Sequence, residues 1–154
     1  MKWAKKLSEF TQPVIDFIDV ATRYCRLIES REDKTKIKLL QEAFIILPQL
    51  CLCEMKLPDI KRLSDYEETE IPHEQWNDIS KSLGRKFKNH NYYKKMFDPY
   101  DRKDKKPVTG SLSDDLTDIY LDIIPGLRAW GKASSADRLN IIWYWKLGFS
   151  SHWG

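Results

Sequence analysis

Apolar residues recur along the chain at the spacing of one helix face. Between residues 9 and 30 they fall three, four or seven positions apart, which predicts an amphipathic helix with one side toward a core. Pro13 lies near the start of this helix, where a missing backbone N–H does no harm. The expected core positions of the first helix are Phe10, Val14, Phe17, Ile18, Ala21, Cys25 and Ile28.

A second helix is expected from about residue 33 to residue 55. Asp33 can cap its first turn, and Pro48 is expected to kink the helix or divide it in two. An acidic loop then continues through Glu70. The predicted buried stripe of this helix consists of Ile37, Leu40, Phe44, Leu47, Leu50 and Cys51.

Three further helices complete the pattern. Pro72 opens the third, Pro125 is expected to kink the fourth, and Ser134 or Ser135 caps the fifth. The fifth has little polar face, so we expect it to be central in the core. The core positions expected for the three helices are Trp76, Ile79, Leu83 and Phe87; Leu116, Ile119, Tyr120, Ile123, Leu127 and Trp130; and Leu139, Ile142, Trp143, Trp145 and Phe149.

The least regular stretch runs from residue 89 to residue 110. It contains two prolines among charged residues, and we expect a short helical turn around Tyr92–Phe97 within it. No segment of the chain alternates apolar and polar residues over a sustained length. The sequence therefore predicts a single all-α domain over residues 1–154: a compact bundle of about five helices with a long irregular charged loop before the fourth.

Composition excludes a membrane-spanning chain and indicates a cytoplasmic one. Hydrophobic residues make up 42% of the sequence, which is enough for a core, but the longest apolar run is Ile141–Trp145. A bilayer span needs roughly 20 apolar residues. The three cysteines are an odd number in a chain that needs no cross-links, so we expect reduced thiols.

The net charge of +3 is unevenly distributed. Residues 85–106 hold nine Lys and Arg against three Asp, whereas residues 54–78 hold eight Asp and Glu against three Lys and Arg. Basic side chains interleaved with aromatic rings are typical of single-stranded nucleic-acid binding, although a solvated loop or a surface for an acidic protein fits the same pattern. The candidate partner surface consists of Arg85, Lys86, Lys88, Lys94, Lys95, Arg102, Lys103, Lys105 and Lys106.

An acidic motif at the start of the fourth helix is the most specific feature of the chain. At 100° per residue, Asp114, Asp118 and Asp122 form one stripe that faces away from the core, and Asp115 flanks it. Ser111-x-x-Asp114 has the form of a capping box, and acids in a first helical turn interact favourably with the helix dipole. The alternative is a divalent-cation site or a cationic partner. The candidate polar site consists of Asp114, Asp115, Asp118, Tyr120, Asp122 and His152.

Several short motifs occur in a distinctive order along the chain: Tyr24-Cys25, Leu57-Pro58, Phe97-Asp98-Pro99, the Asp-Asp-Leu-x-Asp-Ile-Tyr element within 110–120, Trp143-x-Trp145 and His152-Trp153-Gly154. In these motifs the chain resembles the bacterial domain of unknown function 5063. The resemblance extends from residue 24 to the end of the chain. It implies an all-α fold and a bacterial cytoplasmic setting, and it implies no reaction.

The sequence supports three hypotheses about function. The first is a non-enzymatic protein that binds another protein, as an accessory or immunity-type factor, because the chain has no Gly-rich phosphate loop, Gly-x-Ser-x-Gly element or zinc-ligand spacing. The second is a metal-dependent hydrolase that uses Asp114, Asp115 and Asp118. The third is nucleic-acid binding through residues 85–106. We expect no cofactor.

Overall fold

Five α-helices account for most of the described chain. The computed structural model describes residues 11–63, 65–96, 98, 100–103 and 105–153. The helices are α2 (Thr11–Glu29), α3 (Lys36–Met55), α4 (His73–Phe87), α5 (Leu112–Trp130) and α6 (Ser135–Gly148). Short helical turns follow three of them: η1 (Arg31–Asp33), η2 (Lys88–Asn91) and η3 (Phe149–Trp153). The predicted helical bundle is therefore confirmed.

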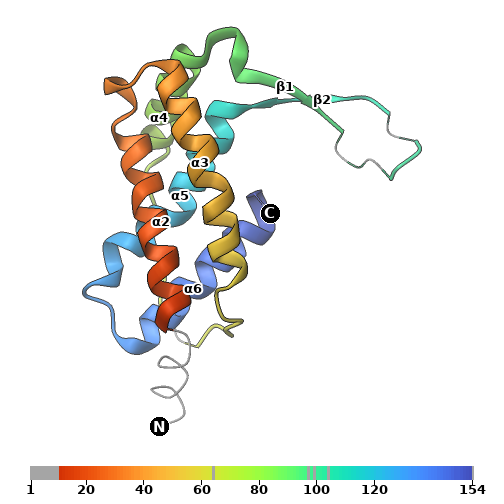
Figure 1. Ribbon diagram of the computed structural model, residues 1–154. Coiled ribbons are helices and arrows are strands. Elements are labelled where there is room, and N and C mark those ends of the chain that lie inside the picture. The colour runs from red at the N-terminus through yellow and green to blue at the C-terminus, as the bar shows by residue number, and fades with distance from the viewer. Residues whose placement is uncertain (1–10, 64, 97, 99, 104, 154) are drawn as a thin grey trace.

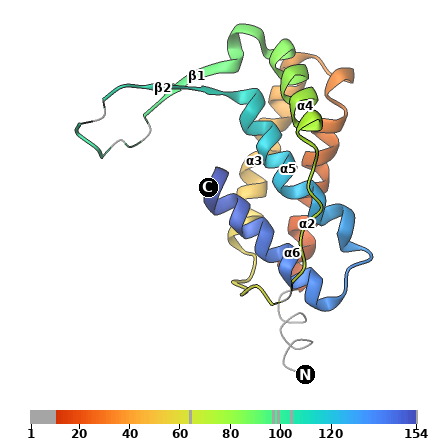
Figure 2. The same cartoon turned by 180° about the vertical axis from the view of Figure 1, so that it is seen from behind.

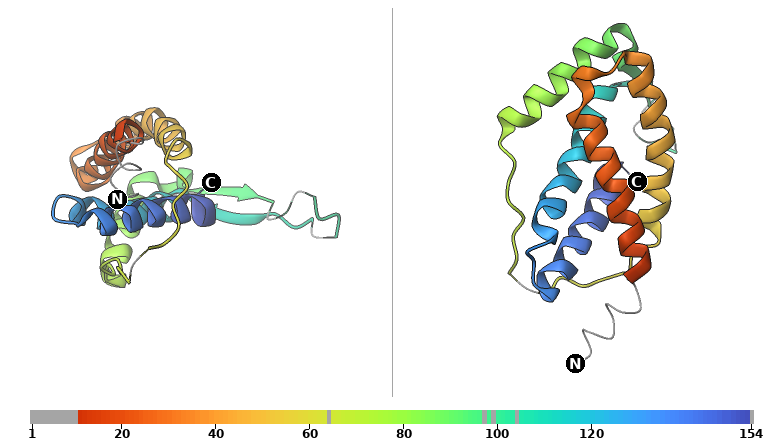
Figure 3. Two further views of the ribbon diagram at one scale, coloured as in Figure 1. Left: turned by 90° about the horizontal axis from the view of Figure 1, so that it is seen from below. Right: turned by 60° about the vertical axis from the view of Figure 1, so that its left-hand side comes forward.

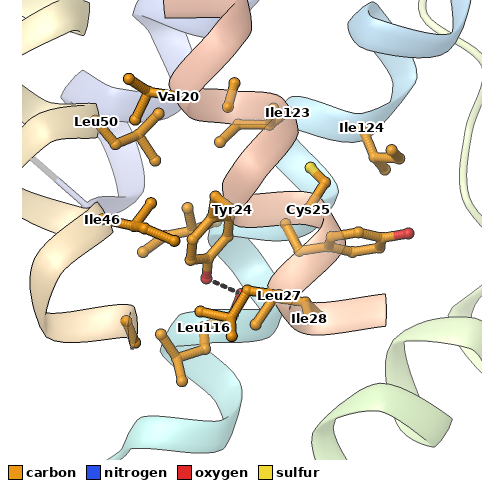
Figure 4. Packing of buried hydrophobic residues seen from close by; sticks show 14 of the residues in the cluster. Val20, Tyr24, Cys25, Leu27, Ile28, Ile46, Leu50, Leu116, Ile123 and Ile124 are labelled. Atoms are coloured by element: carbon orange, nitrogen blue, oxygen red, sulfur yellow. Dashed lines mark hydrogen bonds between the residues drawn. The ribbon is translucent and has the colours of Figure 1, made fainter. Parts of the chain in front are cut away.

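The central helix of the bundle is α5. It packs against α2, α4 and α6, whereas α3 packs mainly against α2 (Figure 1). Figure 4 shows the core where α2, α3 and α5 meet, with the Tyr24 hydroxyl donating a hydrogen bond to the backbone carbonyl of Leu116 at 2.7 Å. The small polar face of α6 had predicted that helix at the centre instead. Its Trp145 is buried as expected, but Trp143 and Phe149 are only half-buried.

The predicted core face of α3 is right for Leu50, which is buried, and wrong for two of its other residues. Phe44 is 81% exposed and Ile37 is 65% exposed, although both were expected in the core. Because α3 is apolar on two opposite faces, its hydrophobic periodicity does not determine which face is buried. The residues that α3 buries are Leu39, Ala43, Ile46, Leu50 and Glu54.

Capping side chains set the starts of the helices. Thr35, not the expected Asp33, caps α3 by accepting a hydrogen bond from the backbone N–H of Lys38 at 3.2 Å. Ser134 caps α6 as expected, with its hydroxyl accepting from the N–H of Asp137 at 3.1 Å. α3 continues through Pro48 as one helix, because packing against α2 compensates for the backbone hydrogen bond that proline removes.

A β-hairpin replaces the helical turn that was expected around Tyr92–Phe97. Strands β1 (Tyr92–Lys95) and β2 (Val108–Ser111) pair antiparallel, with Tyr93 opposite Gly110. We call residues 92–111 the arm. It projects from one end of the bundle between α4 and α5 (Figures 1 and 2).

The acidic loop between α3 and α4 forms a strap along the bundle. We use this name for residues 57–63 and 65–72. Lys146 of α6 donates to the carbonyl of Leu57 at 2.9 Å, and the buried Asn140 side chain accepts from the N–H of Leu63 at 2.9 Å. These two polar residues of α6 therefore hold the strap in place, and Figure 2 shows its path along the bundle. None of the helices in the described ranges combines the length and the apolar character that a bilayer crossing requires.

Candidate functional site

The acidic motif lies where the arm joins the bundle. Ser111 is the last residue of β2 and the N-cap of α5, with its hydroxyl accepting from the N–H of Asp114 at 3.4 Å. The buried Asn91 side chain accepts from the N–H of Ser113 at 2.8 Å and donates to the Ser113 hydroxyl at 2.9 Å. This network ties the end of α4 to the start of α5. It fixes the base of the arm.

Two carboxylates of the predicted stripe face α4. Asp114 accepts a hydrogen bond from the Ser80 hydroxyl at 2.5 Å, and Asp118 accepts from the indole N–H of Trp76 at 2.7 Å. The stripe does point away from the main core, but α4 covers part of it. Packing against α4 therefore explains Asp114 and Asp118, because each accepts a hydrogen bond from a side chain of that helix.

Asp115 faces the arm. Its carboxylate accepts a hydrogen bond from the Tyr93 hydroxyl, which raises the pKa of Tyr93 to about 12. The Tyr93 ring reaches Asp115 by crossing directly over Gly110. A Cβ atom at position 110 would lie 2.3 Å from the ring carbon that carries the hydroxyl, so only glycine leaves room for this contact.

We expect Gly110→Ala to release the Tyr93 ring from Asp115. The methyl group occupies the path of the ring, whose free end can swing away without disrupting the helices. The pKa of Tyr93 should then fall from about 12 toward its ordinary value of 10. Titration of the Tyr93 ring signal by NMR measures this. The matched control is Gly84→Ala, where the new Cβ makes only ordinary contacts at 3.5 Å or more. An unchanged Tyr93 titration in Gly110→Ala would contradict this account.

Tyr120 points toward α2, away from the acidic stripe. Its hydroxyl donates to the Glu29 carboxylate at 2.9 Å, and burial together with this carboxylate raises the pKa of Tyr120. Tyr120 and Asp118 are therefore held by different neighbours. Tyr120 joins α5 to α2.

The carboxylates of the motif do not converge on one point. Asp114, Asp115 and Asp118 are held by donors from α4 and from the arm, on separate sides of α5. Among the described residues, no group of three or more His, Cys, Asp or Glu side chains is placed to hold a metal ion. The hydrogen bonds of the motif attach α5 to α4 and to the arm.

Asp122 lies at the other end of the stripe, beside α6 and the strap. A Cβ added to Gly148 would lie 3.0 Å from the Asp122 carboxylate, so the two helices are in close contact there. Glu68 of the strap faces Asp122 and has one buried carboxylate oxygen that finds no hydrogen-bond partner among the residues that the structure describes. The side chain of His152 lies outside the described part of the chain, so its place in the candidate polar site stays a prediction.

Glu68 lines a cleft of about 410 Å³ between the strap, α5 and α6. The lining residues are Glu67, Glu68, Thr69, Glu70, Ile71, Leu121, Pro125 and Tyr144. Burial, with a smaller contribution from the charge of Asp122, raises the pKa of Glu68 to about 7. Nothing in the residue spacing of the strap marks Glu68, because its burial depends on the path of the strap along the bundle.

We expect Glu68 to make the protein less stable as pH rises from about 4.5 to about 7. In this range the folded protein holds the Glu68 proton more tightly than the unfolded chain does, so the free energy of unfolding falls with increasing pH. Between pH 5 and pH 8 the free energy of unfolding should fall less in Glu68→Gln than in the unaltered protein. The difference should be on the order of 1–2 kcal/mol, allowing for partial solvent access. Urea denaturation at both pH values measures it. Glu67→Gln is the control, because that side chain is 76% exposed. An equal effect of both variants would contradict the attribution of this pH dependence to Glu68.

The structure divides the predicted basic surface into two parts. Lys86 donates to the carbonyl of Lys34 at 2.5 Å, and it lies with Arg85 near Glu32, whose pKa is lowered mainly by a hydrogen bond from Ser82. Arg85, Lys86 and Lys88 therefore belong to the end of α4 and the turn that follows. The six basic residues on the arm are Lys94, Lys95, Arg102, Lys103, Lys105 and Lys106.

Comparison with known proteins establishes the family. The family model described as a domain of unknown function (DUF5063) matches residues 8–154. The fold is similar to that of protein BF1032 from Bacteroides fragilis, with a TM-score of 0.80 and 22% sequence identity over 94% of this chain and 85% of that chain. No curated protein matches the chain. The chain belongs to the DUF5063 family.

Proposed function

We propose that this protein binds an acidic partner protein through the arm and catalyses no reaction. The observation that carries the proposal is the projection of the arm from the bundle (Figure 1). Tyr100 is 91% exposed there and Tyr92 is 65% exposed. Residues 92–111 hold six Lys and Arg against three Asp, a net charge of +3. Tyrosine is enriched at protein-binding surfaces, and the positive charge favours association with an acidic protein.

The base of the arm supports this proposal because it is held in a fixed orientation. The Tyr93–Asp115 hydrogen bond and the Asn91 network attach β1 and β2 to the start of α5. A binding element that is ordered before it meets its partner loses less conformational entropy on binding. The acidic motif thus has a part in function. It presents the arm, and it takes no part in chemistry.

The distribution of charge on the arm favours a protein partner over nucleic acid. Asp98 and Asp101 alternate with the basic residues, and each accepts a backbone hydrogen bond of 2.8 Å, from Tyr100 and from Lys103. Carboxylates at the tip reduce the attraction for a chain of phosphates. A protein surface can match both signs of charge.

An accessory or immunity-type protein acts by occupying the surface of another protein, and it needs no catalytic group. No specific observation favours a metal-dependent hydrolase, because Asp114, Asp115 and Asp118 each have a separate hydrogen-bond donor. The three cysteines are free thiols, which supports a cytoplasmic setting for this function.

Site-specific photocrosslinking in the native host tests the proposal. Tyr100 is replaced by a photoreactive benzophenone amino acid, and the covalent products are identified by mass spectrometry. The matched control carries the same group at Ile15, which is 51% exposed on α2. We expect a discrete adduct with an acidic protein from position 100 and not from position 15. We expect the complex to dissociate when salt is raised, because the contact is largely ionic.

Three other outcomes would overturn the proposal. One is an adduct with nucleic acid from position 100, and the second is the same set of protein adducts from both positions. The third is no protein adduct from position 100 while the variant remains folded, as judged by circular dichroism.

A further inference from the structure

The outward face of α3 is apolar along its whole length. Five large hydrophobic side chains of this helix are 54–81% exposed, and Pro48 and Gln41 lie exposed between them. We call this surface the α3 stripe. Its members are Ile37, Gln41, Phe44, Ile45, Pro48, Leu52 and Met55.

The α3 stripe is a single continuous face. At 100° per residue its seven members fall within an arc of about 100°, the width of the apolar face of an amphipathic helix. Leu39, Ala43, Ile46 and Leu50 lie on the opposite side and pack into the core. α3 stands at the outer edge of the bundle beside α2 (Figure 3). Within the described residues, the stripe is therefore uncovered.

The α3 stripe contains no charged residue. Lys38 flanks it, and its ammonium group lies 3.9 Å from the carboxylate of Glu42 one turn further on. Binding through the stripe would therefore desolvate apolar side chains and a single amide, that of Gln41. Depletion of charge at the centre and charged groups at the edge are the composition of a protein interface.

The exposed area of the stripe is close to what a dimer requires. A fully exposed side chain of this size offers about 150–250 Å², so the five large residues together expose on the order of 600 Å². The half-buried Leu40, Leu47 and Cys51 border the stripe and extend it. A stable interface of standard size buries about 800 Å² on each partner. The stripe with its borders reaches this range.

We propose that a second copy of this chain covers the α3 stripe, with the two α3 helices packed antiparallel about a twofold axis. A twofold interface uses the same surface on both partners, so the stripe must complement itself when it is reversed. An axis near residue 46 places Ile37 opposite Met55 of the other copy, and the large ring of Phe44 opposite the short, flat Pro48. Apolar residues meet apolar residues along the contact except at Gln41, which this axis places opposite Cys51.

This dimer is independent of the function proposed for the arm. The stripe lies on α3, and the arm leaves the bundle between α4 and α5. Substitutions in the stripe therefore test the dimer without altering the arm.

Light scattering coupled to size-exclusion chromatography tests the dimer. At roughly 100 µM the full chain should have a mass of 36.6 kDa, twice the 18.3 kDa of one chain. Phe44→Glu places two like charges near the twofold axis and should raise the dimer Kd at least 100-fold, so that over a dilution series its mass falls to 18.3 kDa at a concentration about 100 times higher than for the unaltered chain. Because Phe44 is 81% exposed, the variant should fold normally. Ile15→Glu, on α2, should remain dimeric.

The result that would overturn the proposal is a monomeric full chain at this concentration. Equal loss of the dimer in Ile15→Glu and Phe44→Glu would also overturn it, because the contact would then not depend on the stripe. Sedimentation with phosphatidylcholine vesicles tests whether a lipid surface, and not a second copy of the chain, covers the α3 stripe. A monomer that binds vesicles through Phe44 would assign the stripe to a lipid surface, and the dimer would be rejected.

Discussion

Trp145→Ala is expected to lower the free energy of unfolding by about 3–5 kcal/mol. Trp145 is 1% exposed, and its indole N–H donates to the carbonyl of Ile123 at 3.2 Å. Its ring packs 4.8 Å from the ring of Phe17 and 5.5 Å from that of Trp130, measured between centroids. Truncation therefore removes a large contact area between α2, α5 and α6 and leaves a carbonyl without its donor.

Urea denaturation followed by circular dichroism measures this loss. Trp143→Ala on the same helix is the matched control, because Trp143 is half-buried and lies against the Arg62 side chain. We expect the control to lose roughly 1 kcal/mol, as is typical of a side chain outside the core. Equal losses from the two variants would show that α6 does not enter the core through Trp145.

Gly126→Ala is expected to destabilise the protein by about 2 kcal/mol, although alanine is the better helix former. A Cβ at position 126 would lie 2.7 Å from the Cγ2 atom of Ile141 and 2.7 Å from the indole nitrogen of Trp145. Gly126 is buried in α5, where that helix crosses α6. The added methyl group must therefore push the two helices apart.

Gly131→Ala is the matched control for this substitution. Gly131 follows the last residue of α5 in a helical conformation, and a Cβ there meets nothing within 4 Å. We expect a gain of about 0.5–1 kcal/mol from the reduced entropy of the unfolded chain. The double variant Gly126→Ala with Trp145→Ala should lose less than the sum of the two, because Trp145 supplies part of the clash. A gain from Gly126→Ala would contradict the close helix contact.

Hydrophobic periodicity correctly predicted the buried face of a helix where its apolar residues lie on one side only. In α2, Val14, Phe17 and Ala21 were expected in the core and are buried, because the opposite side of that helix is polar. In α3 the same reasoning failed. Ile37 and Phe44 match a helical spacing as well as the buried residues do, and only the position of α2 decides which face is covered.

The arm could not be predicted from local sequence. Its strands are four residues each, too short for an alternating pattern to emerge, and they pair across the residues between Lys95 and Val108. Position 110 requires glycine because the ring of Tyr93 crosses over it, and the ring lies there only when the two strands pair in this register. Prolines and charges in this stretch correctly indicated a connection between helices, without showing its form.

The hydrogen-bond donors that surround the acidic motif could not be predicted from the sequence, and the motif's role as a site stays a prediction. The N-cap at Ser111 follows from local spacing, as the capping pattern predicted. The donors for Asp114 and Asp118 come from Ser80 and Trp76, more than 30 positions away, and no local pattern connects them. Trp76 was expected in the core for its size, yet it is half-buried because its N–H serves Asp118.

The contact between Tyr24 and Leu116 has a consequence during synthesis of the chain. The two residues are 92 positions apart, so the ribosome adds 92 residues after Tyr24 before its partner carbonyl exists. At about 5–20 residues per second this takes on the order of 5–20 s. During that time α3 is the helix available to cover α2. The nascent chain therefore presents an incomplete core to chaperones until α5 has left the ribosome.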